Sequence, residues 1–478
     1  MKYLSVCLFF FLGFIFNLSS QELPSKQKVL EKMTLANNYF LNKWPDPTQT
    51  IVTNKTRPSN LWTRGTYFEG LMQLYYINNN ATLYKYAVDW GTFHKWQPTY
   101  TGTTPTRIAD NQCCFQTYIE LYQIEPKPDR IAMLKLSLDD MVNSTKVDDW
   151  WWIDALHMAM PVFAKYGNVT SDNKYYEKMF DLYNHTKTIE GGPGLYNPAD
   201  SLWYRDKDYL PPTVSPNGLP VYWSRGNGWV FAALTRTLDV LPLEAPHREE
   251  YLTTFKQMAG KLIQLQRADG FWNCNLGDQN DYGGKETSGT VFYTFGLAWG
   301  INHNVLDSAI YYPTVVKGWN GLVNSALHSN GSLGYVQSAG SKPADGQPLT
   351  YDKMPDFDDF ALGGFLLAGS EVYRLAKDSN LINSNKNLVE NTFKLITYPN
   401  PGTSSINIQY KTNSKNSLLK IVNPIGQIVY SYKSENLDEV NLRWYGETND
   451  GVRLPNGIYI VFLECNSKTM STKVFLKR

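Results

Sequence analysis

The sequence has few cysteines and few histidines, and neither residue type recurs at the spacing of a metal site. It contains 5 Cys and 6 His among 478 residues, so neither a disulfide-stapled fold nor a zinc-stabilised fold is predicted. Cys113 and Cys114 are adjacent in the chain, and adjacent cysteines cannot easily bond each other. We expect four cysteines to be small buried residues: Cys113, Cys114, Cys274 and Cys465.

The sequence also lacks an excess of one charge. The formal net charge is +1, so no global field attracts nucleic acid or an anionic membrane, and neither is expected as a partner. Beyond the N-terminus no segment is apolar enough to cross a bilayer. Residues 1–20 combine one Lys, a short apolar run and a polar end with small residues, which predicts a secretory signal peptide. Cys7 lies inside that run and not at its end, so no lipid anchor is expected.

The sequence is rich in aromatic residues, and its apolar residues follow a helical pattern over most of the chain. It contains 14 Trp and 32 Tyr, and from about Ser25 to Ala376 apolar residues recur at spacings of three and four. Such runs number roughly twelve. Turns followed by an aromatic or apolar pair recur after three of them, near residues 192–196, 269–272 and 330–335. Residues 21–376 are therefore predicted to form an all-α (α/α)6 toroid, in which the loops at one end line a central pocket.

After residue 376 the pattern changes. Residues 377–396 are polar and predict a linker. In residues 397–478 the apolar residues alternate with polar ones, as at Ile406, Ile408 and Tyr410, which predicts a small all-β sandwich. This tail resembles the type A sorting domain of type IX secretion. The matching segments, in order, are Tyr398-Pro399-Asn400-Pro401, Asn423-Pro424-Ile425-Gly426-Gln427, Leu454-Pro455-Asn456-Gly457-Ile458-Tyr459 and Lys473-Val474-Phe475-Leu476-Lys477-Arg478.

The resemblance of the tail implies export through the type IX secretion machinery to the cell surface or the medium, in a Bacteroidota-like bacterium. It also implies that the tail has no catalytic role. The alternative is a carbohydrate-binding or immunoglobulin-like module.

The richest cluster in the helical part is Trp150-Trp151-Trp152-Ile153-Asp154, at the start of an apolar run. Tryptophan faces stack on sugar rings, and apolar walls raise the pKa of a carboxyl group. That environment suits a general acid acting on a carbohydrate. The structural alternative is a helix start with core tryptophans and Asp154 as its N-cap.

Four further clusters place polar residues before an apolar helical run, and in a helical ring such positions gather at one mouth. They contain Trp62, Asp110, the Trp223–Trp229 segment and Glu286. Each has a structural alternative as well. Asp110, Thr287 or Ser288 can act as N-caps, Gly226 and Gly228 as turn residues, and Glu286 as a first-turn partner of the helix dipole.

Three of these clusters carry a family resemblance, which spans most of residues 25–376. The helical region resembles glycoside hydrolase family 105, the unsaturated rhamnogalacturonyl hydrolases, which is related to family 88. The segments that carry it are Trp152-Ile153-Asp154-Ala155-Leu156-His157-Met158, Trp223-Ser224-Arg225-Gly226-Asn227-Gly228-Trp229, Glu286-Thr287-Ser288-Gly289-Thr290 and residues 360–371.

Carried over by motif, the resemblance implies that Asp154 is the catalytic acid and base and that Asp110 is its partner carboxylate. The implied substrate contacts are Trp152, Arg225 and Trp229, to which we add Trp62 and Trp223 from the same clusters. One departure stands out. The family often has a His after the Gly-rich turn, whereas residues 195–203 contain none, so the contacts from this loop stay open.

The family's substrates are oligosaccharides released by polysaccharide lyases, which end in a 4,5-unsaturated uronic acid. This group is a vinyl ether, so we expect protonated Asp154 to donate to C4 and water to add at C5. A carboxyl with a raised pKa is needed, and Asp110 as a neighbouring like charge helps to raise it. The guanidinium of Arg225 is expected to pair the uronate carboxylate. No metal and no organic cofactor is expected.

Two other functions remain open from the sequence. One is an inverting (α/α)6 glycosidase that acts on saturated oligosaccharides, and the other is a non-catalytic glycan-binding protein. The source polymer is also open between ulvan and rhamnogalacturonan, both of which yield an unsaturated uronate on rhamnose. We favour ulvan because the tail is typical of bacteria common on algae. Lys285, Arg205 or Lys207 then offers a positive charge for sulfate.

Overall fold

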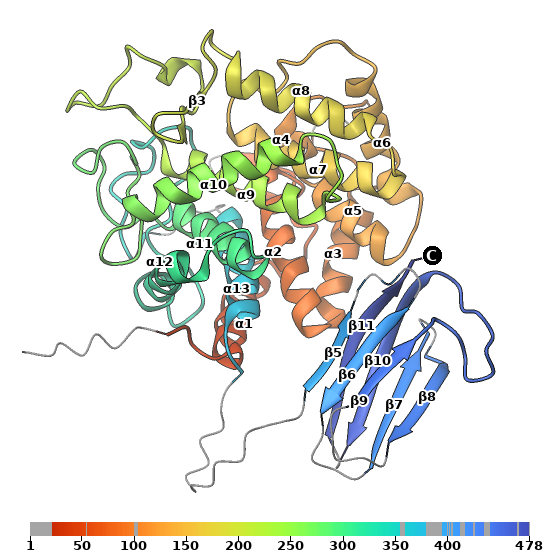
Figure 1. Ribbon diagram of the computed structural model, residues 1–478. Helices are drawn as coiled ribbons and strands as arrows, with labels where there is room; N and C mark the ends of the chain where they lie inside the picture. The colour runs from red at the N-terminus through yellow and green to blue at the C-terminus, as the bar shows by residue number, and fades with distance from the viewer. Residues whose placement is uncertain are drawn as a thin grey trace, which may run out of the picture. The chain divides into compact units, whose positions relative to one another are not determined.

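The structure is a computed structural model with two compact units, residues 1–380 and 381–478 (Figure 1). It describes residues 22–53, 55–99, 104–353, 359–378, 394–398, 400, 402, 405–411, 416–423, 426–434, 440–465 and 468–477. The predicted signal peptide and most of the predicted linker lie outside the described residues.

The first unit is a closed ring of inner helices. Each inner helix packs against the next, and the last packs against the first, in the order α2, α5, α7, α9, α11, α13. Their bounds are Trp62–Asn78, Phe115–Ile124, Asp154–Thr170, Ser224–Val240, Thr287–Asn302 and Asp359–Leu375. A single turn, α4 (Ala109–Gln112), precedes α5 and packs on α7.

Outer helices pack against this ring. They are α1 (Lys26–Lys43), α3 (Ala81–Phe93), α6 (Asp129–Val142), α8 (Lys174–Thr188), α10 (Arg248–Leu265) and α12 (Ser308–Gly321). A π-helical segment, Leu322–Ala326, follows α12. The (α/α)6 toroid predicted from the sequence is thereby confirmed.

The two layers differ in sequence because they differ in burial. The outer helix α1 buries one stripe, with Val29, Met33, Ala36 and Phe40 facing the ring. The inner helix α11 buries every residue from Thr287 to Ile301, so it is apolar on nearly all sides. Spacings of three and four therefore identify the outer helices, whereas the inner helices lack a polar face.

Glycines let the ring close tightly. A Cβ on Gly70 of α2 would lie 2.3 Å from the carbonyl oxygen of Gly363 in α13, and a Cβ on Gly363 would lie 2.2 Å from the carbonyl oxygen of Thr66. Gly226 and Gly228 lie inside α9, so their interpretation as turn residues is wrong. A Cβ on Gly228 would lie 3.3 Å from the Cα of Gly289, so this glycine serves the close approach of α9 to α11.

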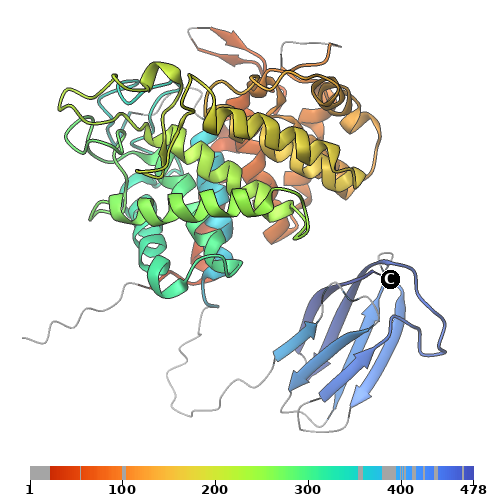
Figure 2. The same cartoon turned by 45° about the horizontal axis from the view of Figure 1, so that its top comes forward.

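Long loops precede α9 and α11. They lie on the same side of the helical unit in both views (Figures 1 and 2). The first loop contains the two-stranded pair β3 (Tyr196–Asn197) and β4 (Leu202–Trp203) and the 3₁₀ turn Lys207–Tyr209. A similar pair, β1 (Ile51–Val52) and β2 (Thr56–Arg57), precedes α2.

The second unit consists of two antiparallel sheets. One has the strand order β11-β10-β7-β8 and the other the order β5-β6-β9. The bounds are β5 Lys394–Tyr398, β6 Ile406–Lys411, β7 Ser417–Val422, β8 Ile428–Ser434, β9 Val440–Trp444, β10 Gly457–Cys465 and β11 Lys468–Leu476. Alternate residues of both sheets enter one apolar core, including the predicted Ile406, Ile408 and Tyr410.

The four cysteines of the described residues are free and buried, as predicted. No helix in the described part of the chain has the length and apolarity needed to cross a membrane.

Candidate active site

The starts of the inner helices converge at one end of the ring. Trp62 is the first residue of α2, Asp154 the first of α7 and Arg225 the second of α9. Their contacts with each other and with the starts of α11 and α13, described below, place these positions around one mouth. The starts of these helices therefore lie together at one end of the ring, which we call the mouth.

Asp154 lies at the beginning of α7 and is 8% exposed. Its side chain makes no capping hydrogen bond to the helix, because Ile153 occupies the N-cap position. Burial raises the pKa of Asp154, while the cations Arg205 and Arg225 work against that rise. The Oδ2 atom of Asp154 lies 3.4 Å from Nε of Arg205. The N-cap interpretation of Asp154 is therefore wrong, and the carboxyl group is free for chemistry.

Asp110 in α4 is half-buried and is coupled to Asp154. Burial and the negative charge on Asp154 together raise the pKa of Asp110 to about 7, against the opposing charge of Arg205. Its side chain caps no helix, so the N-cap interpretation is wrong here as well. Because each carboxylate disfavours the ionisation of the other, the pair can retain one proton near neutral pH.

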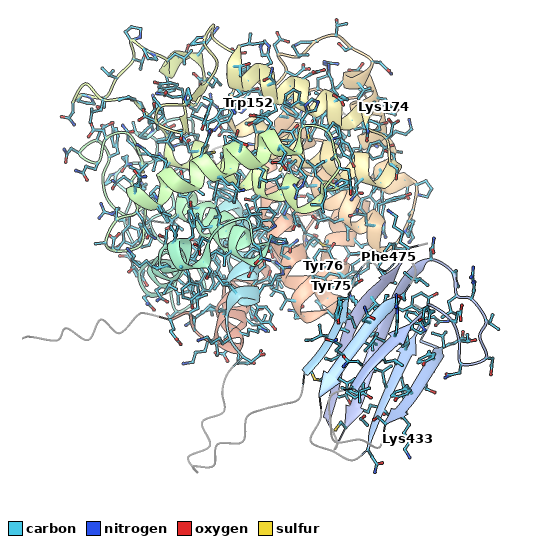
Figure 3. All side chains as sticks on the ribbon, in the orientation of Figure 1. Tyr75, Tyr76, Trp152, Lys174, Lys433 and Phe475 are labelled. Atoms are coloured by element: carbon cyan, nitrogen blue, oxygen red, sulfur yellow. The ribbon has the colours of Figure 1, made fainter. Side chains whose placement is uncertain are left out.

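The three consecutive tryptophans have different surroundings. Trp150 is fully buried, Trp152 is 7% exposed and Trp151 is 49% exposed. The rings of Trp151 and Trp152 are tilted against each other with centroids 4.6 Å apart. Figure 3 labels Trp152 near the top of the helical unit. Of the three, Trp151 offers the largest open aromatic surface beside Asp154.

Arg225 is fully buried and is held by a loop that the sequence analysis did not single out. Its Nη1 donates to the carbonyl oxygen of Gln337 at 2.7 Å, and its Nη2 donates to that of Ser338 at 2.8 Å. The guanidinium carbon lies 4.5 Å from the ring of Trp223. Trp223, also buried, donates from Nε1 to Oε1 of Gln337 at 2.8 Å. Both predicted contacts thus pack together and anchor residues 337–338.

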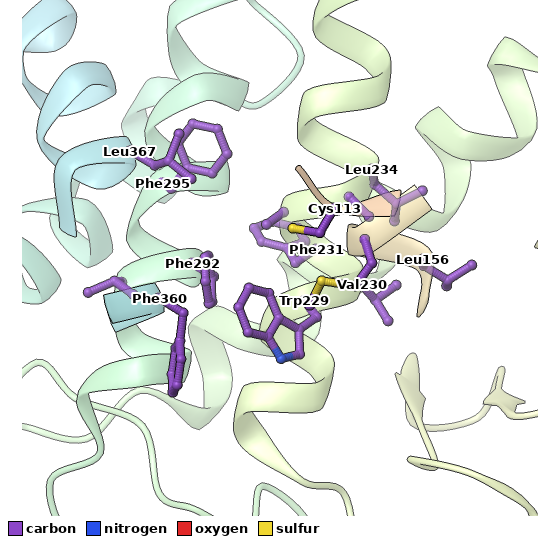
Figure 4. Close-up of a cluster of buried hydrophobic side chains, with 14 of the residues drawn as sticks. Cys113, Leu156, Trp229, Val230, Phe231, Leu234, Phe292, Phe295, Phe360 and Leu367 are labelled. Atoms are coloured by element: carbon purple, nitrogen blue, oxygen red, sulfur yellow. The ribbon is translucent and has the colours of Figure 1, made fainter. Parts of the chain in front are cut away.

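Trp62 and Trp229 form an aromatic floor. Trp62 is half-buried; its ring meets that of Trp229 edge-on at 6.0 Å and stacks on Phe360 at 5.5 Å. Trp229 is fully buried, and Figure 4 shows it among Phe292, Phe360 and other apolar side chains. Trp229 therefore lies beneath the mouth, and Trp62 lies nearer to solvent.

Glu286 is the N-cap of α11. Its Oε1 accepts from the backbone N of Ser288 at 2.6 Å, and its Oε2 accepts from that of Gly289 at 2.7 Å. Burial raises the pKa of Glu286, and these hydrogen bonds and the charge of Arg225 oppose the rise. The cap is thus Glu286, and the alternative that Thr287 or Ser288 caps this helix is wrong.

Arg205 is the functional candidate that the sequence analysis underrated, since it named this residue only as a contact for sulfate. It follows the β3–β4 pair, in the loop that lacks the family's His. Its Nη1 donates to Oδ2 of Asp206 at 2.6 Å, and its carbonyl oxygen accepts from the N of Ile153 at 3.0 Å. No motif indicates this contact, because residues 153 and 205 meet only through the fold.

The opposite end of the inner helices holds a second group of buried charges. A cavity of about 150 Å³ lies there. It is lined by Gln73, Tyr76, Glu120, Gln123, Lys165, Arg236, Asp239, Val240, Phe295, Trp299 and Glu371. Glu120 forms ion pairs with Lys165 and, at 3.0 Å, with Nη2 of Arg236. Deeper in the ring, Oε2 of Glu69 lies 3.0 Å from Nε2 of His157 and 3.2 Å from Nε of Arg236.

No group of three or more His, Cys, Asp or Glu side chains within the described ranges is arranged to hold a metal ion. The mouth contains two carboxyl groups with raised pKa values, two guanidinium groups and several indole rings. Such a set can transfer protons to a bound sugar and can bind an anionic group.

Known proteins show the same architecture. Residues 32–376 match the model of Glycosyl Hydrolase Family 88, and residues 397–477 match the secretion system C-terminal sorting domain. An unsaturated 3S-rhamnoglycuronyl hydrolase of Formosa agariphila is 33% identical over 66% of this chain and 84% of its own.

Two solved structures are similar as well. A family 88 glycosyl hydrolase from Bacteroides vulgatus superimposes with a TM-score of 0.67 at 33% identity, covering 73% of this chain and 99% of that one. A structure described as a polysaccharide lyase gives a TM-score of 0.66 at 32% identity, covering 73% and 98%. The resemblance inferred from the sequence is confirmed: the chain belongs to glycosyl hydrolase family 88 and is a glycoside hydrolase with a C-terminal secretion sorting domain.

Proposed function

We propose that this enzyme removes a 4,5-unsaturated uronic acid from the non-reducing end of oligosaccharides that polysaccharide lyases release. The observation that carries the proposal is the coupled pair Asp110 and Asp154, which has raised pKa values and lies beside two arginines. Family membership and the activity named for the Formosa relative support it.

The chemistry is the hydration of a vinyl ether. Asp154 donates the proton of the pair to C4 of the unsaturated ring, and positive charge develops at C5 and the ring oxygen. A water molecule then adds at C5 and returns one proton to the carboxylate pair. The hemiketal opens, which releases the next sugar as an alcohol and leaves an open keto acid. One water is consumed and the acid is regenerated, so the two carboxyl groups suffice.

The proposed substrate unit is an unsaturated uronate linked to rhamnose. The name of the Formosa relative, an unsaturated 3S-rhamnoglycuronyl hydrolase, supports this linkage. Ulvan and rhamnogalacturonan are the two proposed sources, and we favour ulvan. The tryptophan side chains at the mouth, above all the exposed Trp151, supply faces on which the sugar rings can stack.

The proposed location is outside the cell. The sorting domain supports delivery by the type IX secretion machinery to the cell surface or the medium. We propose that a signal peptide at residues 1–20 first directs the chain to the periplasm.

Ultraviolet absorbance distinguishes this activity from its alternatives, because the conjugated double bond absorbs and its hydration removes the band. Lyase digests of ulvan and of rhamnogalacturonan are incubated with the enzyme. A falling absorbance supports the proposal, and the digest that reacts faster identifies the polymer. A rising absorbance on intact polymer would show a lyase, and reducing sugar from saturated oligosaccharides would show an ordinary glycosidase. Binding without turnover would show a glycan-binding protein.

A further inference from the structure

The two arginines at the mouth are held in different ways. Both Nη atoms of Arg225 donate to backbone carbonyl oxygens, those of Gln337 and Ser338, and the side chain is fully buried. Nη1 of Arg225 also lies 3.4 Å from Oγ of Ser288, and the fully buried guanidinium leaves no exposed surface for a substrate anion. Its position therefore favours a structural task.

Arg205 is partly exposed, whereas Arg225 is fully buried. Its side chain is 16% exposed, and its Nε lies 3.4 Å from Oδ2 of Asp154 without forming a hydrogen bond. Its Nη1 is fixed by the buried carboxylate of Asp206 at 2.6 Å, so the guanidinium plane has a defined orientation. The exposed ring of Trp151 lies 5.8 Å from its Cζ atom. A positive charge and an aromatic face thus adjoin the carboxyl group of Asp154.

The substrate's chemistry requires a cation at this place. The carboxylate of a 4,5-unsaturated uronic acid is attached to C5, the direct neighbour of the C4 atom that accepts the proton. A group that binds this carboxylate must therefore lie next to the proton donor. Among the described cations, Arg205 is the one whose side chain is both beside Asp154 and partly exposed.

Resting on the proposed function, we propose that Arg205 binds the uronate carboxylate of the substrate, with Trp151 as the adjoining wall. Arg225 instead holds residues 337–338 in place. Arg205 thus supplies the anion contact of the loop that lacks the family's His.

In this arrangement, binding of the uronate carboxylate affects the protonation of Asp154. The charged groups that face Asp154 are Asp110 from α4, Arg205 and Asp206 from the loop after β4, and Arg225 from α9. An anion bound to Arg205 adds negative charge beside Asp154 and offsets the cation that lowers its pKa. The pKa of Asp154 rises, so the bound uronate itself favours the protonated form that the reaction needs.

The test compares two substrates and three variants. The substrates are an unsaturated uronyl-rhamnose disaccharide and its methyl ester at C6, which carries no charge. The variants are Arg205→Gln, Arg205→Lys and the control Lys256→Gln, which removes an exposed positive charge from the outer helix α10.

We expect Arg205→Gln to lose about 10- to 100-fold in kcat/KM on the acid, mostly through KM, because a charge-assisted contact is lost. The same variant should change little on the ester, so the preference for the acid collapses. Arg205→Lys should recover part of the preference, and Lys256→Gln should match the wild type on both substrates. In the wild type, the pKa seen in kcat should exceed that seen in kcat/KM on the acid but not on the ester.

An unchanged ratio of acid to ester rates in Arg205→Gln would overturn the assignment. If Arg205→Gln unfolds at a much lower temperature than the wild type, Arg205→Lys provides the test instead. A folded Arg205→Lys variant with no change in substrate preference or pH profile would also overturn the assignment. A folded Arg225→Gln variant that alone loses the preference would give the role to Arg225. If the wild type hydrolyses neither substrate, the proposed function falls, and this assignment falls with it.

Discussion

The two ends of the helical ring both hold buried charges, but the charges are paired differently. At the mouth, Asp110 and Asp154 lie close to each other, and burial leaves both with raised pKa values. The network at the opposite end reaches Glu69 deeper in the ring, where burial alone would raise the pKa of this carboxyl group, yet His157 and Arg236 outweigh it and the pKa is lowered. Figure 3 labels Trp152 at the first end and Tyr76, which lines the cavity, at the other.

This difference separates carboxyl groups that can donate a proton from carboxylates that stay ionised. Carboxyl groups placed together resist ionisation and remain able to donate a proton. Carboxylates placed among cations stay ionised and contribute to a fixed network instead. The apolar layer around Trp229, Phe292 and Phe360 forms a buried core within the ring (Figure 4).

The largest expected effect is at the mouth. The substitution Asp154→Asn keeps the size of the side chain but removes the transferable proton, so kcat should fall by about 10²–10⁴-fold. The melting temperature should stay close to that of the wild type. Asp148→Asn, an exposed carboxylate in the same segment, is the control and should keep full activity. More than a tenth of the wild-type rate in Asp154→Asn would remove Asp154 from its role.

At the opposite end of the ring, a substitution should lower stability and leave activity nearly unchanged. Glu120→Gln leaves the buried Lys165 without its carboxylate and leaves Arg236 with Glu69 alone. Breaking a buried ion pair from one side costs about 3–5 kcal/mol, so the free energy of unfolding should drop while kcat of the folded enzyme changes little. Denaturant unfolding and initial rates measure the two quantities. The exposed Glu177→Gln serves as the control. A stable but inactive Glu120→Gln variant would contradict the structural role.

The pH dependence of activity should reflect the carboxyl pair. Because the pKa of Asp110 is about 7 and the pair must keep one proton, kcat/KM should be lost as the pH rises above about 7. Initial rates of absorbance loss across the pH range give this profile. A rate that increases steadily up to pH 9 would show that a protonated carboxyl group is not the acid.

The free energy of unfolding should also depend on pH through the titration of Asp110. The pKa of Asp110 is raised from 3.8 to about 7, so the folded chain holds a proton that the unfolded chain has lost between these values. Stability from this group is therefore present at low pH and is lost as the pH rises through about 7. Asp110→Asn should then melt at a higher temperature than the wild type at pH 8, with the difference shrinking toward pH 4. The opposite trend would contradict the buried, charge-coupled environment of Asp110.

The smallest expected effect concerns the tail. A chain that ends at residue 396 contains the whole helical unit, so it should fold and hydrolyse small unsaturated disaccharides at the full-length rate. In the native host the truncated chain should remain in the periplasm. A folded but inactive truncated enzyme would show that the tail contributes to the site, and its appearance in the medium would show that the tail is not needed for export.

Much of the architecture followed from residue patterns. The spacing of Val29, Met33, Ala36 and Phe40 identifies an outer helix, and the alternation of Ile406, Ile408 and Tyr410 identifies a strand. Both patterns are local, because burial of one face imposes the repeat of the helix or of the strand on the sequence. A local pattern, the tryptophans that precede it, also indicates Asp154 as a candidate site residue.

The tertiary structure alone decided what surrounds these residues. Arg205 meets Asp154 across 51 positions of chain, and Arg225 meets the carbonyl oxygen of Gln337 across 112. Composition and residue spacing do not indicate which residues so far apart in the chain come into contact. These contacts form only when six inner helices bring their starts together. The sequence by itself determined the ring and the tail and indicated Asp154 as a candidate. Packing decided which arginine lies partly exposed beside Asp154 and which carboxyl groups have raised pKa values, since burial and neighbouring charge set both.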